Sequence, residues 1–266
     1  MIEALLFSLC LGLQKPEQEV PAVIDTPALW RGGAWLARLG GTVEDGGGKI
    51  DFEDNIDLRN KETVPLLEFS LEPTETLTMS LSFFDFSTSG NGLYVGNDVY
   101  GGVGFNNGNA WSGSTHMQSV GIETAWSVWE PYQAGNNATL SFAPVAGLRW
   151  FGIDTHLSND TTVQKVTHEN TWVTLQAGLE MEFRWDTRDT LNWADFVSID
   201  AQLLVGAMLG NDGGSMASIQ AGLGVDFTPN IGGFFGYRLQ ELNAEDGAYT
   251  FDAGLQGLFV GGEIRF

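Results

Sequence analysis

The last nine residues of the chain are Leu258, Phe259, Val260, Gly261, Gly262, Glu263, Ile264, Arg265 and Phe266. Every second residue back from the terminus, from Phe266 to Leu258, is apolar or glycine. The alternate positions carry both charges of the stretch, Glu263 and Arg265. Because side chains of a β-strand point alternately to its two faces, this pattern predicts a strand between an apolar and a polar environment.

Nine further stretches alternate in the same way and are separated by turn residues such as Asn, Gly and Pro. The clearest runs from Val173 to Arg184, where apolar residues alternate with Thr, Gln, Gly, Glu and Arg without interruption. The ten predicted strands are residues 30–42, 64–72, 77–83, 115–129, 139–157, 173–184, 197–207, 217–227, 232–242 and 249–266. We therefore predict an all-β, antiparallel up-and-down barrel of about ten strands, with eight or twelve as alternatives.

Composition narrows the class of protein. The 266 residues include 35 Gly, 17 Phe and 9 Trp, and the mean hydropathy is -0.04. No apolar run approaches the length of about 18 residues that indicates a membrane-spanning helix. The formal net charge of -22 argues against nucleic acid as a partner, because a nucleic-acid binder needs a basic face.

The one-sided distribution of charge favours a barrel in a membrane over a soluble one. In the strands at 173–184, 197–207, 217–227 and 258–266, one face carries no charged residue at all. A water-exposed outer face would contain Lys and Glu, whereas the lumen of a membrane barrel can be polar and mixed. The alternative is a soluble, secreted β-barrel binding protein.

Together with these strands, the terminal Phe266 makes the chain resemble the bacterial outer-membrane β-barrels, as a small porin-like or omptin-sized member. The resemblance implies location in the outer membrane, contact with its lipids and lipopolysaccharide, and a monomer. It also implies that Phe266 is the signal by which the barrel-insertion machinery recognises the closing strand.

Three segments are expected along the chain. Residues 1–14 contain a short apolar core suited to a signal peptide, although Glu3 stands where a positive charge is usual. Residues 15–28 are expected to be a linker, and residues 29–266 the transmembrane barrel. The only cysteine, Cys10, falls in the signal peptide, so the mature barrel would contain no disulfide.

Counting back from a periplasmic C-terminus assigns each connection to one side of the membrane. The connections at 73–75, 130–138, 185–193 and 228–231 are then periplasmic. Those at 43–63, 87–114, 158–170, 210–214 and 243–248 are extracellular, and 87–114 is expected to contain a hairpin near 93–105. An aromatic girdle is predicted at the periplasmic strand ends, formed by Trp30, Trp129, Tyr132, Trp185, Trp193, Phe196, Phe227 and Phe266.

Charged residues on the predicted lumen face should pair across strands and plug a barrel this narrow, because an unpaired buried charge is costly. In particular, Arg149 and Glu180 are expected to meet if the 158–170 loop is centred near residue 164. The predicted network comprises Arg38, Glu68, Glu123, Arg149, Glu180, Glu182, Arg184, Asp200, Asp226, Arg238, Glu263 and Arg265.

Residue types that could support catalysis gather at the predicted extracellular rim. They are His116, His156 and His168, with Asp154, Asp160 and Glu169 nearby. Lipid A-modifying enzymes and omptin-like proteases are outer-membrane barrels with catalytic groups near that rim. Strand parity, however, directs His116 and His156 outward and His168 inward, which argues against one shared site.

The sequence therefore predicts no catalytic residues, no metal and no cofactor. An acidic loop starting at Asp51 has calcium-ligand offsets, but Ile56 stands where the sharp turn needs glycine. The predicted function is that of a non-catalytic barrel with a largely plugged lumen, in a structural, surface-interaction or minor pore role. A rim-sited enzyme is the remaining alternative.

Overall fold

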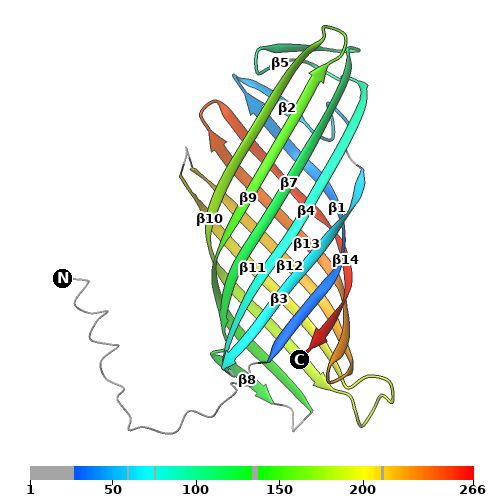
Figure 1. The fold of residues 1–266 in the computed structure, drawn as a ribbon, viewed down its shortest axis with the longest axis vertical. Helices are drawn as coiled ribbons and strands as arrows, with labels where there is room; N and C mark the ends of the chain where they lie inside the picture. Colours follow the sequence, from blue (N-terminus) through cyan, green and yellow to red (C-terminus); the bar gives the residue numbers. More distant parts are fainter. Residues whose placement is uncertain (1–26, 59, 75, 134–136, 211–212) are drawn as a thin grey trace, which may run out of the picture.

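The computed structural model describes residues 27–266, apart from 59, 75, 134–136 and 211–212 (Figure 1). The predicted signal peptide, residues 1–14, lies outside the described residues, as does nearly all of the predicted linker. Within the described residues no helix is long and apolar enough to cross a membrane.

Ten antiparallel strands form a closed barrel, as predicted. Each barrel strand pairs with the barrel strands that precede and follow it in the sequence. β14 also pairs with β1, so that Leu258 lies opposite Leu36. The strands are β1 (Ala28–Asp45), β3 (Lys61–Thr74), β4 (Leu77–Leu93), β7 (Ala110–Trp126), β9 (Ala138–Asn159), β10 (Gln164–Asp186), β11 (Phe196–Leu209), β12 (Gly213–Thr228), β13 (Ile231–Asp246) and β14 (Tyr249–Arg265). Closure satisfies the backbone groups of the first and last strands, which a lipid environment requires.

Four short strands lie at the two ends of the barrel. β2 (Gly48–Asp51) pairs with the upper end of β1, where β3 no longer reaches. β5 (Asn97–Tyr100) and β6 (Val103–Asn106) form the hairpin predicted within residues 87–114, and β5 lies at the extracellular end in Figure 1. β8 (Trp129–Gln133) lies at the opposite end, beside β9.

Several strands continue much further on the extracellular side than predicted. The stretch 158–170 was predicted as a polar loop, but β9 and β10 remain paired up to Asn159 and Gln164, and only four residues connect them. The upper parts of β4 and β7 likewise occupy much of 87–114. These polar residues do not indicate a loop, because they belong to strand segments whose outer face contacts water instead of lipid.

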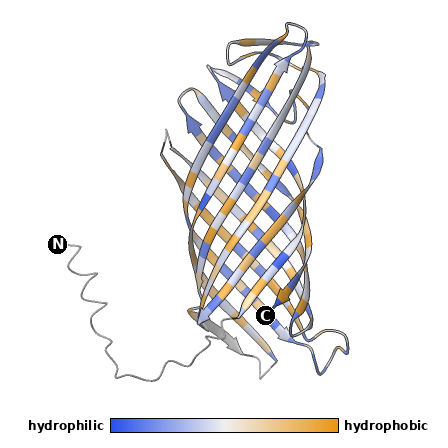
Figure 2. Cartoon of the chain, viewed as in Figure 1, coloured by the Kyte–Doolittle hydropathy of each residue, from blue (hydrophilic) through white to orange (hydrophobic). Residues whose placement is uncertain are grey.

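An apolar belt surrounds the lower part of the barrel, which includes the C-terminus. Its side chains are between 36% and 59% exposed, although all are large and hydrophobic. They include Leu36, Leu67, Met79, Leu81, Ile122, Leu148, Leu175, Leu179, Leu203, Val205, Ile219, Leu223, Phe235, Leu258, Val260 and Ile264. Figure 2 shows hydrophobic and hydrophilic residues alternating along the strands. A continuous apolar outer band on a closed, even-stranded barrel is the architecture of an outer-membrane protein, and it rules out the soluble alternative.

Above this belt the outward positions become polar. On β14 the outward residues change from Leu258 to Gln256 and Asp252, and on β4 they change from Phe83 to Asp85. The same change brings Arg38 to the outer wall, where it pairs with Glu53 at 2.9 Å. The prediction that Arg38 faces the lumen is therefore wrong.

The first strand was misassigned because its apolar residues face inward. Trp35, Ala37 and Leu39 have no exposed surface and pack inside the barrel, so Arg38 must point outward. In the other nine strands the predicted lumen face and lipid face are those observed, including Glu263 and Arg265 inside β14.

Exposed aromatic residues mark the periplasmic end of the belt. Trp30, Trp185, Trp193, Phe227 and Phe266 are all more than 40% exposed there, as predicted for an interfacial girdle. Phe196 differs, because its ring packs against the guanidinium of Arg184 at 4.2 Å, on the lumen side. The side chains of Trp129 and Tyr132 lie outside the described residues.

Candidate functional site: the barrel interior and its extracellular cap

The centre of the lumen contains an ion pair that is bonded by side chains from several strands. Arg149 of β9 donates to Glu123 of β7 at 2.7 Å, and also to Ser119 and Ser82. Gln176 and Gln202 donate to the same Glu123 carboxylate from β10 and β11. Arg149 is only 3% exposed. Five strands therefore supply one network, which links the walls across the barrel.

A second network lies nearer the periplasmic end. Asp226 accepts from Arg184 at 2.8 Å and from Arg265 at 3.2 Å. Glu263 accepts from Arg265 at 3.1 Å and from Arg31 at 2.8 Å. Arg184 of β10, Asp226 of β12 and Arg265 of β14 thus meet, and opposite charges pair across these strands.

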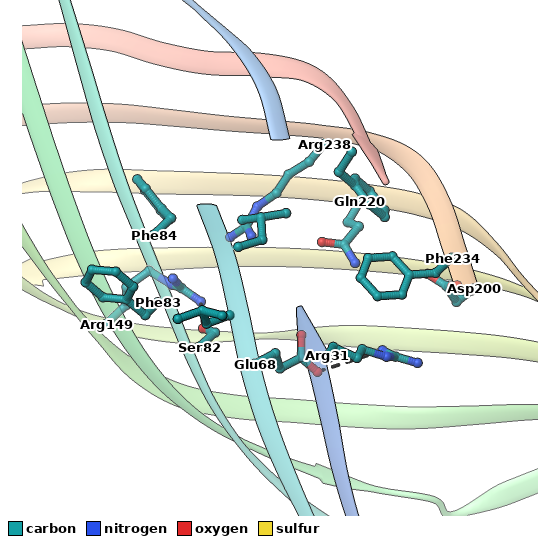
Figure 3. Close-up of a pocket in the computed structure, with 13 residues that line it drawn as sticks. Arg31, Glu68, Ser82, Phe83, Phe84, Arg149, Asp200, Gln220, Phe234 and Arg238 are labelled. Atoms are coloured by element: carbon teal, nitrogen blue, oxygen red, sulfur yellow. Dashed lines mark hydrogen bonds and ion pairs between the residues drawn. The ribbon is translucent and has the colours of Figure 1, made fainter. Parts of the chain in front are cut away.

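Arg31 is a lumen residue that the sequence analysis missed. It bonds Glu263 at 2.8 Å and lies 3.8 Å from Glu68. Figure 3 shows Arg31 beside Glu68. Arg31 lies on the same face of β1 as Trp35 and Leu39. Because that apolar face was assigned to lipid, Arg31 was left out of the predicted lumen network. The pairing of β1 with β14 reveals the orientation of β1, because Leu36 lies opposite Leu258, which faces lipid. The even-numbered residues of β1 therefore point outward.

The predicted contact between Arg149 and Glu180 is wrong. Arg149 lies opposite Thr174, six residues from Glu180, and Glu180 lies opposite Ala143. The connection between β9 and β10 is centred before residue 164, because residues 160–163 form it. A small change in the centre of a turn displaces the whole register of the two strands.

The remaining acidic residues line a cavity of about 250 Å³ in the lower lumen. In the part of the chain that the structure describes, no ion pair joins Glu180, Glu182 or Asp200 to a basic side chain. The charged lining comprises Arg31, Arg149, Arg184, Arg238, Arg265, Glu68, Glu72, Glu123, Glu180, Glu182 and Asp200. Because one water occupies roughly 30 Å³, this space can hold several waters that solvate the unpaired carboxylates.

Arg238 lies where the charged lumen meets an aromatic layer. Its guanidinium stacks over Trp35 at 5.4 Å and over Phe84 at 5.8 Å. Arg238, Phe84 and Phe234 line a cavity of only about 40 Å³, and Figure 3 shows how these side chains lie around it. A cation packed on aromatic faces is stabilised there without a carboxylate partner.

Above Arg238 the lumen is filled by buried apolar side chains, which we call the apolar seal. Each is at most 1% exposed, and among them only Phe84 also lines the small cavity beside Arg238. The apolar seal comprises Trp35, Leu39, Phe84, Phe86, Met117, Phe151, Ile153, Phe251 and Leu255. The interior therefore changes from charged and wet near the periplasm to apolar and dry towards the outside.

The β5–β6 hairpin and residues 52–58 cover the extracellular mouth; together we call them the cap. Asn159 of β9 donates to Gly104 of β6 at 2.6 Å, and Asn55 donates to Val95 at 2.6 Å. Phe52 packs against Phe251 of the apolar seal, with ring centroids 6.2 Å apart. The cap is therefore joined to the barrel by hydrogen bonds and to the seal by apolar contact.

His168 of β10 lies beneath the cap and contacts it. It contacts Asp45 at 3.0 Å, stacks on Tyr249 at 4.2 Å and meets the edge of Tyr100 at 5.8 Å. Burial raises the pKa of the Tyr100 hydroxyl above its usual value, so this phenol stays neutral. The arrangement ties β5, β10, β14 and β1 together.

The other two histidines lie elsewhere, on the outer wall. His116 contacts Asp85 at 2.7 Å and Asp154 at 3.6 Å. His156 bonds the Thr167 hydroxyl at 2.8 Å. The three histidines thus occupy three different environments, with the inward and outward directions that parity predicted.

The acids predicted near the histidines do not complete a catalytic arrangement. Asp160 accepts from the hydroxyls of Ser112 and Ser158, and Glu169 lies opposite Asp154 on the neighbouring strand. Among the described residues, no serine or threonine hydroxyl bonds His116. Those residues also contain no group of three or more His, Cys, Asp or Glu side chains placed to hold a metal ion.

No protein-family model matches the sequence, and no curated protein matches it significantly. Solved structures similar to it include three barrels with low identity. The attachment invasion locus protein Ail of Yersinia pestis is 12% identical, with 91% of this chain and 100% of that chain covered and a TM-score of 0.35. The Escherichia coli outer membrane protease OmpT is 10% identical, with 93% and 99% covered and a TM-score of 0.44.

The third is the translocator domain of the autotransporter NalP from Neisseria meningitidis. It is 13% identical, with 100% of this chain and 95% of that chain covered and a TM-score of 0.39. Similarity at this level gives no information about activity. The apolar belt, the closure and the charged lumen of this chain give it the architecture of an outer-membrane β-barrel of ten strands.

Proposed function

We propose that this protein is a non-conducting, non-catalytic outer-membrane barrel that acts through its surfaces. The observation that carries the proposal is the apolar seal, whose side chains fill the upper lumen and are each at most 1% exposed. An ion that left the lower cavity would have to enter this layer without its hydration shell, which is prohibitively costly.

The paired charges of the lower lumen would not by themselves prevent the passage of ions. They pair and hold the walls together, but they enclose a cavity of about 250 Å³ that water can fill. The apolar seal above them, and the cap above the seal, are what would stop ions. The network of polar contacts in the lower lumen then has a structural role, which is to stabilise the wall around a solvated space.

The direct test is single-channel recording of the purified, refolded barrel in planar lipid membranes, with a general porin as the positive control for insertion. We expect no steady conductance from the protein when heat-modifiable gel migration shows that it is folded. Large, stable conductance steps would contradict the proposal and support a pore.

We further propose that Phe266 is read during insertion of the barrel. Its backbone exchanges hydrogen bonds with Ala28, the first residue of β1, and its side chain is 74% exposed. This places an accessible aromatic residue at the seam where the barrel closes.

Replacement Phe266→Ala should reduce the fraction of heat-modifiable protein in outer-membrane fractions several-fold, whereas Phe227→Ala, another exposed girdle position, should not. Equal assembly of the two variants would argue against a special role for the terminal residue.

A further inference from the structure

The cavity in the lower lumen is lined by charges that the protein itself does not neutralise. Five arginines line it, and four of them form ion pairs with lumen carboxylates: Arg31, Arg149, Arg184 and Arg265. Among the described residues no acidic side chain pairs with the fifth, Arg238, and its Nε is buried without a hydrogen-bond partner. Glu180, Glu182 and Asp200 likewise lack a basic partner there. Apart from the exposed Glu72, the unpaired lining is therefore three carboxylates and one guanidinium.

The three carboxylates are crowded on two neighbouring strands. Glu182 of β10 lies directly opposite Asp200 of β11, and both line the cavity. Glu180 is two residues from Glu182 on the same strand, so it points to the same face. Like charges directly opposite each other destabilise a sheet, and a protonated amine between them removes the repulsion because it donates up to three hydrogen bonds. The described residues contain no group placed to hold a metal ion, so the arrangement fits an amine better than a metal.

Arg238 and Glu180 are the two ends of one row across the barrel wall. Arg238 of β13 lies opposite Gln220 of β12. Gln220 in turn lies opposite Gln202 of β11, which lies opposite Glu180 of β10. All four line the cavity, and Figure 3 shows Gln220 between Arg238 and Asp200. The row covers three strand spacings of about 4.8 Å each, with a cation at one end, a carboxylate at the other and two amides between them.

The cavity extends to the periplasmic end of the barrel. Its lining includes Leu29 and Arg265, which lie opposite each other at the periplasmic ends of β1 and β14. The apolar seal lies above it, so a solute would enter from the periplasm. The volume of about 250 Å³ is below the range of about 300–1,000 Å³ that is usual for drug-sized ligands. The space therefore suits a small, polar solute.

We propose that the lower lumen binds one free basic amino acid from the periplasm. Its carboxylate bonds to the guanidinium of Arg238, and its two cationic groups bond to Glu180 and to the opposed pair Glu182 and Asp200. Three carboxylates with one guanidinium complement a ligand that has more positive than negative groups, which a basic amino acid has and a neutral amino acid lacks. The site uses only the lumen below the seal, so it does not depend on the surface role proposed above.

The test is isothermal titration calorimetry of the refolded barrel in a maltoside detergent at low salt, with three related probes. Lysine has one carboxylate and two ammonium groups, cadaverine lacks the carboxylate, and norleucine lacks the side-chain ammonium. We expect one lysine per barrel and at least tenfold weaker binding of the other two probes. If protein with the heat-modifiable migration of a folded barrel bound no lysine, the site would be refuted. Equal binding of lysine and cadaverine would overturn the role of Arg238, and equal binding of norleucine would overturn the role of the carboxylates.

Substitutions separate recognition of the ligand from general effects of charge. Asp200→Asn should weaken lysine binding at least tenfold, yet raise the denaturant midpoint of the ligand-free barrel, because it removes a like-charged pair. Glu169→Gln removes one exposed carboxylate from the outer wall of β10 and is the matched control, which should bind lysine as the wild type does. Arg238→Gln should reduce lysine binding to the level of cadaverine. Equal losses of binding in Asp200→Asn and Glu169→Gln would contradict direct contact between Asp200 and the ligand.

Discussion

The membrane-embedded half of the barrel and its extracellular half are built from the same strands, but their two faces exchange polarity. In the lower half, Leu258 and Val260 face lipid while Glu263 and Arg265 face a wet lumen. In the upper half of the same strand, Asp252 and Gln256 face water while Phe251 and Leu255 are buried inside. One strand therefore follows two opposite rules, because the solvent outside it changes along its length.

This difference shows that alternation alone identifies a strand, but does not show which of its two faces points into the barrel. A membrane barrel hides its charges inside, and a soluble barrel hides its apolar residues inside. Here both arrangements are stacked in one wall, and the transition occurs near Arg238, Trp35 and Phe84. The following substitutions test that division, from the largest expected effect to the smallest.

Phe251→Ala should show that the upper half depends on a packed core. Phe251 has no exposed surface, so its truncation should destabilise the barrel by about 3–5 kcal/mol. Denaturant unfolding in detergent micelles, followed by tryptophan fluorescence, measures this. Thr250→Ala, next to it but on the water side, is the control, and equal losses for the two would contradict a packed upper interior.

Glu123→Ala should show that the lower half depends on paired charge. It leaves the buried Arg149 without its carboxylate, and removing one partner of a buried pair costs about 3–5 kcal/mol. The same unfolding experiment on the double variant Glu123→Leu with Arg149→Met should recover most of that loss. If the double variant were as unstable as Glu123→Ala, loss of packing and not an unpaired charge would be the cause.

Val260→Arg tests the outer face in the membrane half. Val260 lies within the apolar belt of β14, and a charge near the bilayer midplane costs about 2–4 kcal/mol. Refolding into lipid vesicles measures the loss. Asp252→Arg, outward on the same strand but above the belt, should change stability little, and a similar cost at both positions would refute the boundary between them.

Arg38→Ala should have the smallest effect. Its pair with Glu53 is on the outer wall, with both side chains about one-third exposed, and exposed pairs contribute about 0–1 kcal/mol. Arg31→Ala is the matched comparison, because it removes a cation from the buried carboxylate of Glu263. A larger loss for Arg38→Ala than for Arg31→Ala in unfolding experiments would reverse the assignment of the two faces of β1.

Much of the fold could be predicted because it depends on local pattern. Val173 to Arg184 alternate without a break, and the paired lumen and lipid faces of β10 follow directly. The hairpin β5–β6 and the separate directions of the three histidines were predicted on the same basis. The lumen location of all the predicted network charges except Arg38 also follows from parity.

The predictions that failed depended on contacts between residues that are distant in sequence. The faces of β1 were reversed because Trp35 and Leu39 are as apolar as lipid-facing residues, and only pairing with β14 distinguishes the two directions. The Arg149–Glu180 contact failed because the register of β9 and β10 depends on one turn. The apolar seal could not be predicted, because its members come from β1, β4, β7, β9 and β14.

The sequence by itself determined that this chain forms alternating strands and that most of them carry a one-sided apolar face. Those properties need only the two-residue period of a strand. The tertiary structure alone decided which apolar face is inside, which charges pair, and where the dry layer begins. Burial depends on the neighbours that closure brings together, and a residue such as Trp35 has the same identity whether it faces lipid or the core.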